Sequence, residues 1–256
     1  MNQMHSNQRL MDKSKSPKLL EVQNLNAWYG AAHILHEVSL NVGRGEVVAL
    51  MGRNGAGKST TLKSIAALVP RREGSIRFMG EAMEKKASHQ IAQRGLGYVP
   101  EDRRIFTELT VLENLEVGKQ KPRCWPDGQA VPHWTPEKLF ALFPNLGEMP
   151  DRPGGRMSGG EQQMLTVGRT LMGNPFLVLL DEPSEGVAPV IVEQMANMIL
   201  ELKAKGVSIL LSEQNLHFAE LVSDRAYVLE KGQIRFEGTI EELSRAEDIR
   251  RAYLSV

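Results

Sequence analysis

The sequence lacks several features that would fix its class at once. Only one cysteine, Cys124, stands among 256 residues, so no disulfide can form within the chain. No apolar run approaches the roughly 20 residues of a membrane-crossing helix, and the first residues carry no hydrophobic stretch typical of a signal peptide. An excess of one charge is also missing, since 31 basic residues are balanced by 31 acidic ones. We therefore expect a soluble or peripheral protein without bulk attraction to nucleic acid or anionic lipid, whose association with a membrane would need another protein.

The most informative stretch is residues 52–59, GRNGAGKS, which has the spacing of a phosphate-binding loop. The apolar run at 47–51 predicts a buried strand before it, and apolar residues at helical spacing from 62 to 69 predict a helix after it. Glycines between the two let successive backbone N–H groups point at one anion, with the positive end of the helix dipole behind them. We expect Lys58 to lie near the β- and γ-phosphates of a nucleotide and the Ser59 hydroxyl to ligate Mg²⁺.

Acidic residues follow other predicted strands. The run at 176–180 is apolar enough for a buried parallel strand and leads directly into Asp181 and Glu182, and the run at 207–211, predicted to be the last strand of the core, should end at the same edge. Two adjacent acids at this edge suit a nucleotide that carries Mg²⁺. Glu101 also follows a short strand, but on spacing alone a solvated loop charge explains it better.

A second glycine-containing helix start lies at Ser158. Ser158 and Glu161 have the spacing of a capping box, which explains both as structural residues. The capping box does not explain Gly159 and Gly160, which lower helix propensity but let a ligand approach bare N–H groups. The segment is therefore a candidate for a second phosphate site.

The remaining segments indicate how the chain is organised. Residues 1–17 are polar and are expected to form a disordered leader, whereas short alternating segments between 20 and 42 predict edge strands of a mixed or antiparallel sheet. Tyr29, beside Trp28 and before a glycine turn, would on local grounds simply cap the core. The proline- and tryptophan-rich stretch at 119–136 excludes a helix over most of its length and is either a surface loop or a docking element.

Taken in order, the glycine loop, the motif Ser158-Gly159-Gly160-Glu161-Gln162 and the apolar run into Asp181-Glu182 resemble the nucleotide-binding subunit of an ATP-binding cassette transporter. The resemblance covers about residues 19–256. It implies an α/β P-loop NTPase core, with a mainly parallel sheet flanked by helices, together with an antiparallel β subdomain and a helical subdomain. One ATPase domain would then span 18–256, with its helical subdomain at about 93–172 and the 119–136 stretch as an insert.

The same resemblance implies ATP and Mg²⁺ as cofactors, ATP hydrolysis as the activity, and a role for each motif. Glu182 resembles the general base that polarises the attacking water, Asp181 would orient Mg²⁺ with Ser59, and Tyr29 would stack on adenine. The phosphates would be held by Gly52, Arg53, Asn54, Gly55, Ala56, Gly57, Lys58, Ser59 and Thr60, and a partner subunit's nucleotide would be contacted by Ser158, Gly159, Gly160, Glu161 and Gln162.

Three positions depart from the family pattern. Glu101 stands where most members have a glutamine, Gln214 where most have a histidine, and Ala188 where most have an aspartate. A carboxylate at 101 can still ligate Mg²⁺, and Gln214 can donate to a phosphate oxygen although it cannot become cationic. We expect hydrolysis to be retained, because positioning and charge stabilisation carry most of this chemistry.

Four segments are similar in sequence to the LivF-type subunit of importers for branched-chain amino acids, namely 100–106, 160–165, 188–189 and 213–215. Related urea and amide importers share much of this sequence. The implied partners are a second ATP-binding subunit (the same or a related chain), two membrane permease subunits and, indirectly, a periplasmic or extracellular substrate-binding protein. The chain would lie on the cytoplasmic face of the membrane, and no nucleic-acid partner is expected.

Two alternatives belong to other classes. A soluble cassette protein acting on nucleic acid or the ribosome would usually carry two cassettes or a long coiled-coil insert, and neither is present. A small-molecule kinase built on the same phosphate loop would leave residues 158–163 unexplained.

Overall fold

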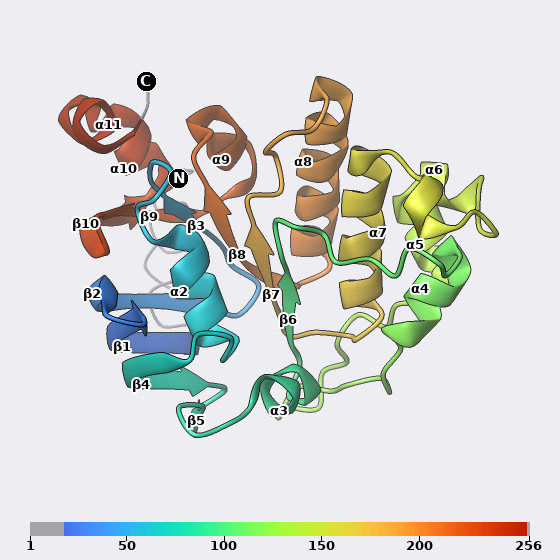
Figure 1. Cartoon of the computed structure of the whole chain (residues 1–256), viewed down its shortest axis with the longest axis horizontal. Helices are drawn as coiled ribbons and strands as arrows, with labels where there is room; N and C mark the ends of the chain where they lie inside the picture. The colour runs from blue at the N-terminus through green and yellow to red at the C-terminus, as the bar shows by residue number, and fades with distance from the viewer. Residues whose placement is uncertain (1–17, 255–256) are drawn as a thin grey trace, which may run out of the picture.

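The computed structural model describes residues 18–254, so the leader expected at 1–17 lies outside the described residues. Its centre is a six-stranded sheet in the order β10-β9-β3-β8-β7-β6, in which only β10 runs antiparallel to its neighbour (Figure 1). The strands are β3 (Val47–Met51), β6 (Leu96–Val99), β7 (Leu177–Asp181), β8 (Ser208–Glu213), β9 (Arg225–Glu230) and β10 (Gln233–Thr239).

The apolar runs form the centre of this sheet, as predicted. Every residue of β3, β7 and β8 is buried, because helices or the second sheet cover both faces. One expectation was wrong: β8 is not the last parallel strand. The chain returns through a short helix, and β9 adds to the other side of β3 in parallel. A hairpin turn at 231–232 joins β9 to β10, and nothing in the local sequence of this turn indicates that β9 pairs with β3.

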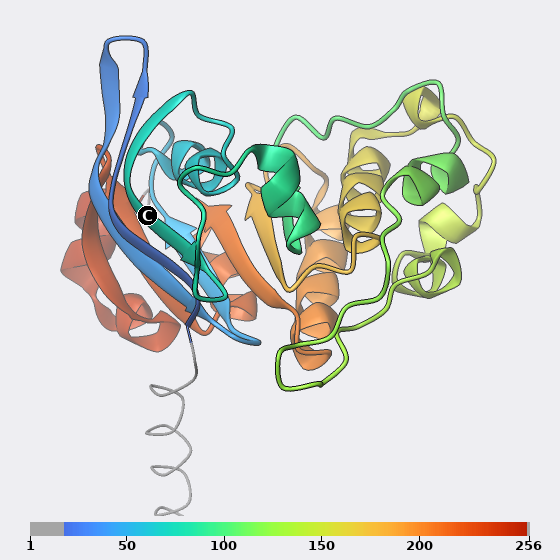
Figure 2. The same cartoon turned by 90° about the horizontal axis from the view of Figure 1, so that it is seen from below.

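The second sheet is antiparallel, with the order β2-β1-β4-β5, and confirms the predicted β subdomain. Its long β1–β2 hairpin projects from the body of the molecule, as Figure 2 shows. Leu35 and Phe78 of this sheet join Leu62 and Leu50 in one hydrophobic cluster, which fastens the sheet to the core. The strands are β1 (Lys18–Tyr29), β2 (Ala32–Gly43), β4 (Arg71–Phe78) and β5 (Glu81–Ala82).

Helices cover the parallel sheet, and four of them, α4 to α7, gather at the end of the molecule opposite the antiparallel sheet (Figure 1). The helices are α2 (Lys58–Ile65), α3 (Ser88–Gln93), α4 (Val111–Val117), α5 (Pro136–Leu142), α6 (Pro144–Gly147), α7 (Gly159–Leu171), α8 (Pro189–Ala204), α9 (Leu216–Val222), α10 (Ile240–Arg245) and α11 (Glu247–Tyr253). None of those between residues 18 and 254 combines the length and apolar character that a bilayer span requires.

The helix after the phosphate loop is shorter than predicted. α2 ends at Ile65 rather than near Val69, because Ala67 adopts a left-handed conformation with φ of 59° and the N–H of Leu68 closes back on the carbonyl of Lys63. Val69 is still buried, so its apolar character reflects packing after the helix end. α8 was not predicted from the sequence.

The 119–136 stretch contains no helix before Pro136, as predicted, and it packs onto its own chain. Trp125 and Trp134 are both buried. The fully buried Asn174 joins the two ends of the loop: its amide donates to the carbonyls of Gln120 and Lys121, and its oxygen accepts from the backbone N–H of Trp134. The loop is therefore closed by one side chain that lies more than 35 residues further along the chain.

Candidate functional site

The phosphate-binding loop joins β3 to α2 and is shaped by its glycines. Gly57 forms the N-cap of α2 with φ of 109°, and no side chain caps this helix start within the described residues. A Cβ on Gly52 would lie 2.4 Å from the carbonyl oxygen of Leu229, so only glycine fits there. The N–H groups at the start of α2 therefore lack a side-chain cap, the condition under which a helix start can bind an anion.

Lys58 reaches back across this loop. Its ammonium group lies 2.8 Å from the carbonyl oxygen of Gly52 and 3.1 Å from that of Arg53, and it pairs at 3.1 Å with the carboxylate of Glu182. The Lys58 and Glu182 side chains are only 2% and 8% exposed, so this is an ion pair held away from bulk water. The structure thus brings together two residues that lie 124 positions apart.

Glu182 turns sharply out of β7 with φ of 48°, a left-handed conformation that is uncommon for a residue other than glycine. Burial opposes ionisation of its carboxyl group, but a hydrogen bond with Glu185 and the charge of Lys58 outweigh it, and the net result is a lowered pKa. The hydrogen bond to Glu182, with burial and the charge of Glu182, raises the pKa of Glu185 to about 7. The lowered pKa of Glu182 keeps its carboxylate ionised near neutral pH, whereas the raised pKa of Glu185 leaves that group partly protonated there.

Asp181 is the last residue of β7 and is fully buried. Its Oδ1 accepts a hydrogen bond from the Ser212 hydroxyl at 2.7 Å, and its Oδ2 accepts one from the Tyr98 hydroxyl at 3.0 Å. Burial and the negative charge of Asp181 raise the pKa of Tyr98, so the phenol keeps its proton and remains a donor. Strands on both sides of β7 therefore orient this carboxylate.

β8 ends in a second buried acid, Glu213, which accepts the backbone N–H groups of Ser184, Gln214 and Asn215. Burial raises its pKa despite these hydrogen bonds. Glu213 thereby shapes the turns that follow β7 and β8, including the partly exposed Gln214.

The oxygen ligands fit Mg²⁺ bound together with a nucleotide. Among residues 18–254, no group of three or more His, Cys, Asp or Glu side chains could hold a metal ion by itself. Mg²⁺ at phosphate sites usually takes one or two protein oxygens and fills its other positions with phosphate and water, so such a cluster is not required. Ser59 and the carboxylate of Asp181 supply hard oxygen donors of the right kind.

Two other predicted residues lie at exposed positions. Tyr29 ends β1 at the turn of the β1–β2 hairpin and is 44% exposed, so its ring does not cap the core of its own chain. Glu101 follows β6 and is exposed. Both side chains are accessible to a ligand.

The segment from Ser158 to Gln162 starts α7. The predicted capping box is present: the Ser158 hydroxyl accepts the N–H of Glu161, whose carboxylate accepts the N–H of Ser158. A Cβ on Gly159 would lie 2.9 Å from the Arg103 guanidinium, and one on Gly160 would lie 2.7 Å from Ile191. Packing against Ile191 therefore explains Gly160, whereas the Arg103 guanidinium, at the flexible end of its side chain, can move away from a Cβ at Gly159.

α2 and α7 lie on opposite sides of β6 and β7 in both views (Figures 1 and 2). The two glycine-containing helix starts therefore do not face each other across one pocket of a single chain. The phosphate loop and the two acids belong to one site, whereas Ser158 to Gln162 form a separate surface.

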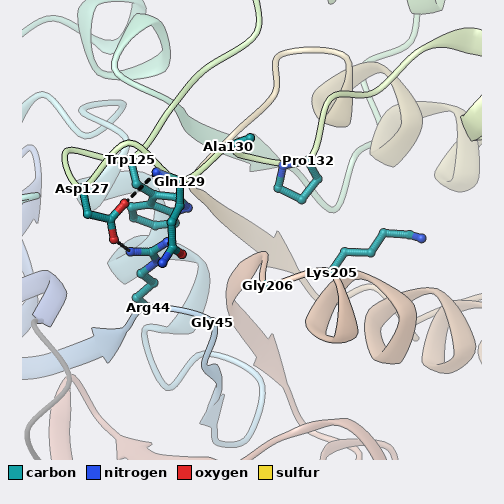
Figure 3. A pocket seen from close by; sticks show the side chains of 9 residues that line it. All are labelled: Arg44, Gly45, Trp125, Asp127, Gln129, Ala130, Pro132, Lys205 and Gly206. Atoms are coloured by element: carbon teal, nitrogen blue, oxygen red, sulfur yellow. Dashed lines mark hydrogen bonds and ion pairs between the residues drawn. The ribbon is translucent and has the colours of Figure 1, made fainter.

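A cavity of about 510 Å³ lies at the other edge of the sheet, where the parallel strands begin (Figure 3). Arg44 precedes β3 and bonds to Asp127 and Gln129 at the tip of the 119–136 loop, with its guanidinium 4.0 Å from the centre of the Trp125 ring. Lys205 borders the opposite side of the cavity. This hollow is separate from the phosphate loop and the acids. Arg44, Asp127 and Gln129 are bonded to one another, and Lys205 pairs with Glu201 outside the lining.

Sequence reasoning missed Tyr98, Ser212, Glu185 and Glu213. Tyr98 and Ser212 act on Asp181 only because β6 and β8 both pair with β7, in a register that sets Ser212 opposite Asp181. Only Glu185 could have been found from local sequence, because it lies three residues after Glu182 and can therefore contact it.

Comparisons with known proteins agree with this geometry. A family model described as ABC transporter matches residues 35–185. The high-affinity branched-chain amino acid transport ATP-binding protein BraG of Pseudomonas aeruginosa is 43% identical over 92% of this chain and 99% of its own length. The lipopolysaccharide export system ATP-binding protein LptB of Haemophilus influenzae is 35% identical over 92% of this chain and 97% of its own. The crystal structure of an ATP-binding cassette of an ABC transporter in its ADP conformation superposes with a TM-score of 0.75 and 30% identity, covering 92% of this chain and 98% of the other.

Proposed function

The chain belongs to the ABC transporter family and is an ATPase of that family, and we propose that it is the nucleotide-binding subunit of an importer for branched-chain or other hydrophobic amino acids. The observation that carries the catalytic part is the pairing of Lys58 with Glu182 at 3.1 Å beside the phosphate loop. The similarity to BraG, at 43% identity over nearly the whole chain, supports the amino-acid cargo.

In this proposal the loop from Gly52 to Thr60 binds the phosphates of ATP through its backbone N–H groups. Ser59, Glu101 and Asp181 would hold Mg²⁺, which would neutralise charge on the β- and γ-phosphates. A triphosphate competes with Glu182 for the Lys58 ammonium. Binding therefore frees the carboxylate of Glu182 to accept a proton from the attacking water, and the ion pair seen in the structure is exchanged for one with substrate.

The site needs a second subunit in this proposal. The start of α7 lies away from the phosphate loop of its own chain, so the Ser158 to Gln162 segment would contact the nucleotide bound by a partner, either a copy or a related chain. Tyr29, exposed at the hairpin turn, would stack on the adenine. Gln214 would donate to a phosphate oxygen.

We further propose that the chain works on the cytoplasmic face of the membrane against two permease subunits, and that a periplasmic or extracellular binding protein delivers the cargo. The helical region at about 93–172 would connect the nucleotide site to the permeases. The similarity to LptB, at 35% identity, makes a subunit of an exporter the second candidate. The eight-point difference in identity at equal coverage of this chain favours the amino-acid importer.

Co-purification followed by uptake tests these proposals together. A tagged copy of the chain, expressed in its own cells, should retain two permease proteins, and deletion of its gene should abolish uptake of labelled leucine. Uptake should return with the parental gene but not with Glu182→Gln, which keeps the fold and removes the base. Retention of a lipopolysaccharide-export membrane protein, with leucine uptake unchanged, would support the second candidate and contradict the first.

A further inference from the structure

Asp181 carries a carboxylate that is wholly enclosed, and each of its oxygens is held by one hydroxyl group. Ser212 is also fully buried and lies 2.7 Å from Oδ1, and Tyr98 lies 3.0 Å from Oδ2. A buried carboxylate needs such donors, because losing water without replacement hydrogen bonds is costly. Each oxygen keeps a further lone pair for another ligand.

The hydroxyl of Ser212 has a second partner that fixes its direction. The backbone N–H of Glu182 lies 3.0 Å from the Ser212 Oγ and 3.2 Å from the Ser212 carbonyl oxygen. A backbone N–H can only donate, so the hydroxyl oxygen accepts from Glu182 and its single proton must go to Asp181. One serine therefore bonds to both neighbouring acids, to the side chain of one and to the backbone of the other.

The bond to Glu182 lies at the point where the chain leaves β7. Glu182 has φ of 48°, a conformation that the surrounding structure must hold in place. β7 and β8 pair in parallel with Asp181 opposite Ser212, so the hydroxyl projects from the neighbouring strand at the level of this turn. The strained turn then aims the Glu182 side chain at Lys58.

We propose that Ser212 is a positioning residue for ATP hydrolysis, which sets the carboxylate of Asp181 and the turn at Glu182 in one fixed geometry. Ser212 acts through these two residues and has no need to touch the nucleotide. The inference rests on the proposed function, because Asp181 acts toward Mg²⁺ and Glu182 toward the attacking water only if ATP binds at this loop.

The same strand provides a matched control. Ser208 is also fully buried, and its hydroxyl also accepts a backbone N–H, that of Gly45 at 2.8 Å. It lies at the opposite end of β8, where the strand begins, away from the two acids. Ser208→Ala thus removes the same chemical group from the same strand, and it separates a loss of packing from a loss of positioning.

The experiment measures how strongly Mg²⁺ promotes nucleotide binding. Titration calorimetry with a non-hydrolysable ATP analogue, once in Mg²⁺ and once in a chelator, gives the ratio of the two affinities for the parent, S212A, S212T and S208A. We expect S212A to lower this ratio, and the kcat for ATP, by about tenfold or more, the effect typical of groups that orient metal ligands. S208A should keep the parental ratio, and S212T, which retains the hydroxyl, should recover most of it.

A parental ratio in S212A, or an equal fall in S212A and S208A, would overturn the inference. If the parent itself binds no analogue and hydrolyses no ATP, the proposed function fails instead. The two failures are therefore distinguishable by the behaviour of the parent.

Discussion

The two edges of the parallel sheet use charge in opposite ways. At the edge where the strands end, Lys58, Asp181 and Glu182 are buried, and their bonds hold an arrangement that a ligand can exchange. At the edge where the strands begin, Arg44 and Asp127 lie nearer the surface and tie the 119–136 loop to the core. Charges at the first edge are therefore placed to act on a ligand, whereas those at the second hold the loop to the rest of the chain. Substitutions at the first edge should change nucleotide binding and turnover, and substitutions at the second should change stability.

The largest expected effect is on turnover, at the edge where the strands end. Glu182→Gln should lower the rate of ATP hydrolysis by about 10²–10⁴-fold, since the amide cannot accept the proton of the attacking water. Binding of ATP should persist, because the phosphate loop is unchanged. Steady-state turnover and equilibrium binding of the purified variant check both, and a parental rate would show that Glu182 is not the base.

Lys58→Ala should weaken ATP binding by about 10–100-fold, the size expected for a lost hydrogen bond to a charged group. It also leaves Glu182 buried without its cation, so the melting temperature should fall as well. Nucleotide titration and thermal melting measure the two effects. Unchanged affinity would mean that Lys58 serves only to neutralise Glu182.

At the opposite edge, Asn174→Ala should act on stability rather than turnover. The substitution leaves the backbone groups that Asn174 binds at Gln120 and Trp134 without their partner, at a cost of about 1–3 kcal/mol for each such group that stays buried. We expect a fall of several degrees in melting temperature, with kcat per folded molecule within twofold of the parent. A large loss of kcat with a normal melting temperature would break the contrast between the two edges.

The smallest effect concerns pH. The pKa of Glu185 is raised to about 7 in the folded protein, above the value of 4.5 expected when it is unfolded. The stability it contributes is therefore complete below about pH 4.5 and is lost as pH rises through about 7. Glu185→Gln should flatten the fall of melting temperature between pH 5 and 8. Some dependence of melting temperature on pH should remain in the variant, because the pKa of Glu213 is also raised. If the melting temperature of parent and variant falls equally with pH, the raised pKa of Glu185 is contradicted.

Local sequence patterns predicted the parts of the site that depend on neighbouring residues. The order of strand, glycine loop and helix identified the phosphate loop, and the capping box at Ser158 was predicted from spacing alone. The end of α2 was not predicted correctly, because the apolar pattern continues to Val69 although the helix stops before the left-handed residue Ala67.

Contacts between distant strands could not be predicted in this way. Ser212 meets Asp181 only through the register of β7 and β8, and Asn174 holds a loop that lies 40 to 54 residues earlier. Nothing near either residue in the sequence specifies its partner. The roles of the predicted ligands toward ATP remain predictions that the variants above test.

In the proposed dimer, the phosphate loop of one chain and the Ser158 segment of another complete a single ATP site. Mixing two inactive variants tests it directly. Lys58→Ala disables the loop, and Ser158→Arg blocks the start of α7, so a mixed pair contains one site with both defects and one with neither. We expect the mixture to regain up to about a quarter of parental ATPase activity, because half of randomly formed pairs are mixed and each has one intact site of two. If the unmutated chain hydrolyses ATP on its own but the mixture of variants recovers no activity, a site shared between two chains is contradicted.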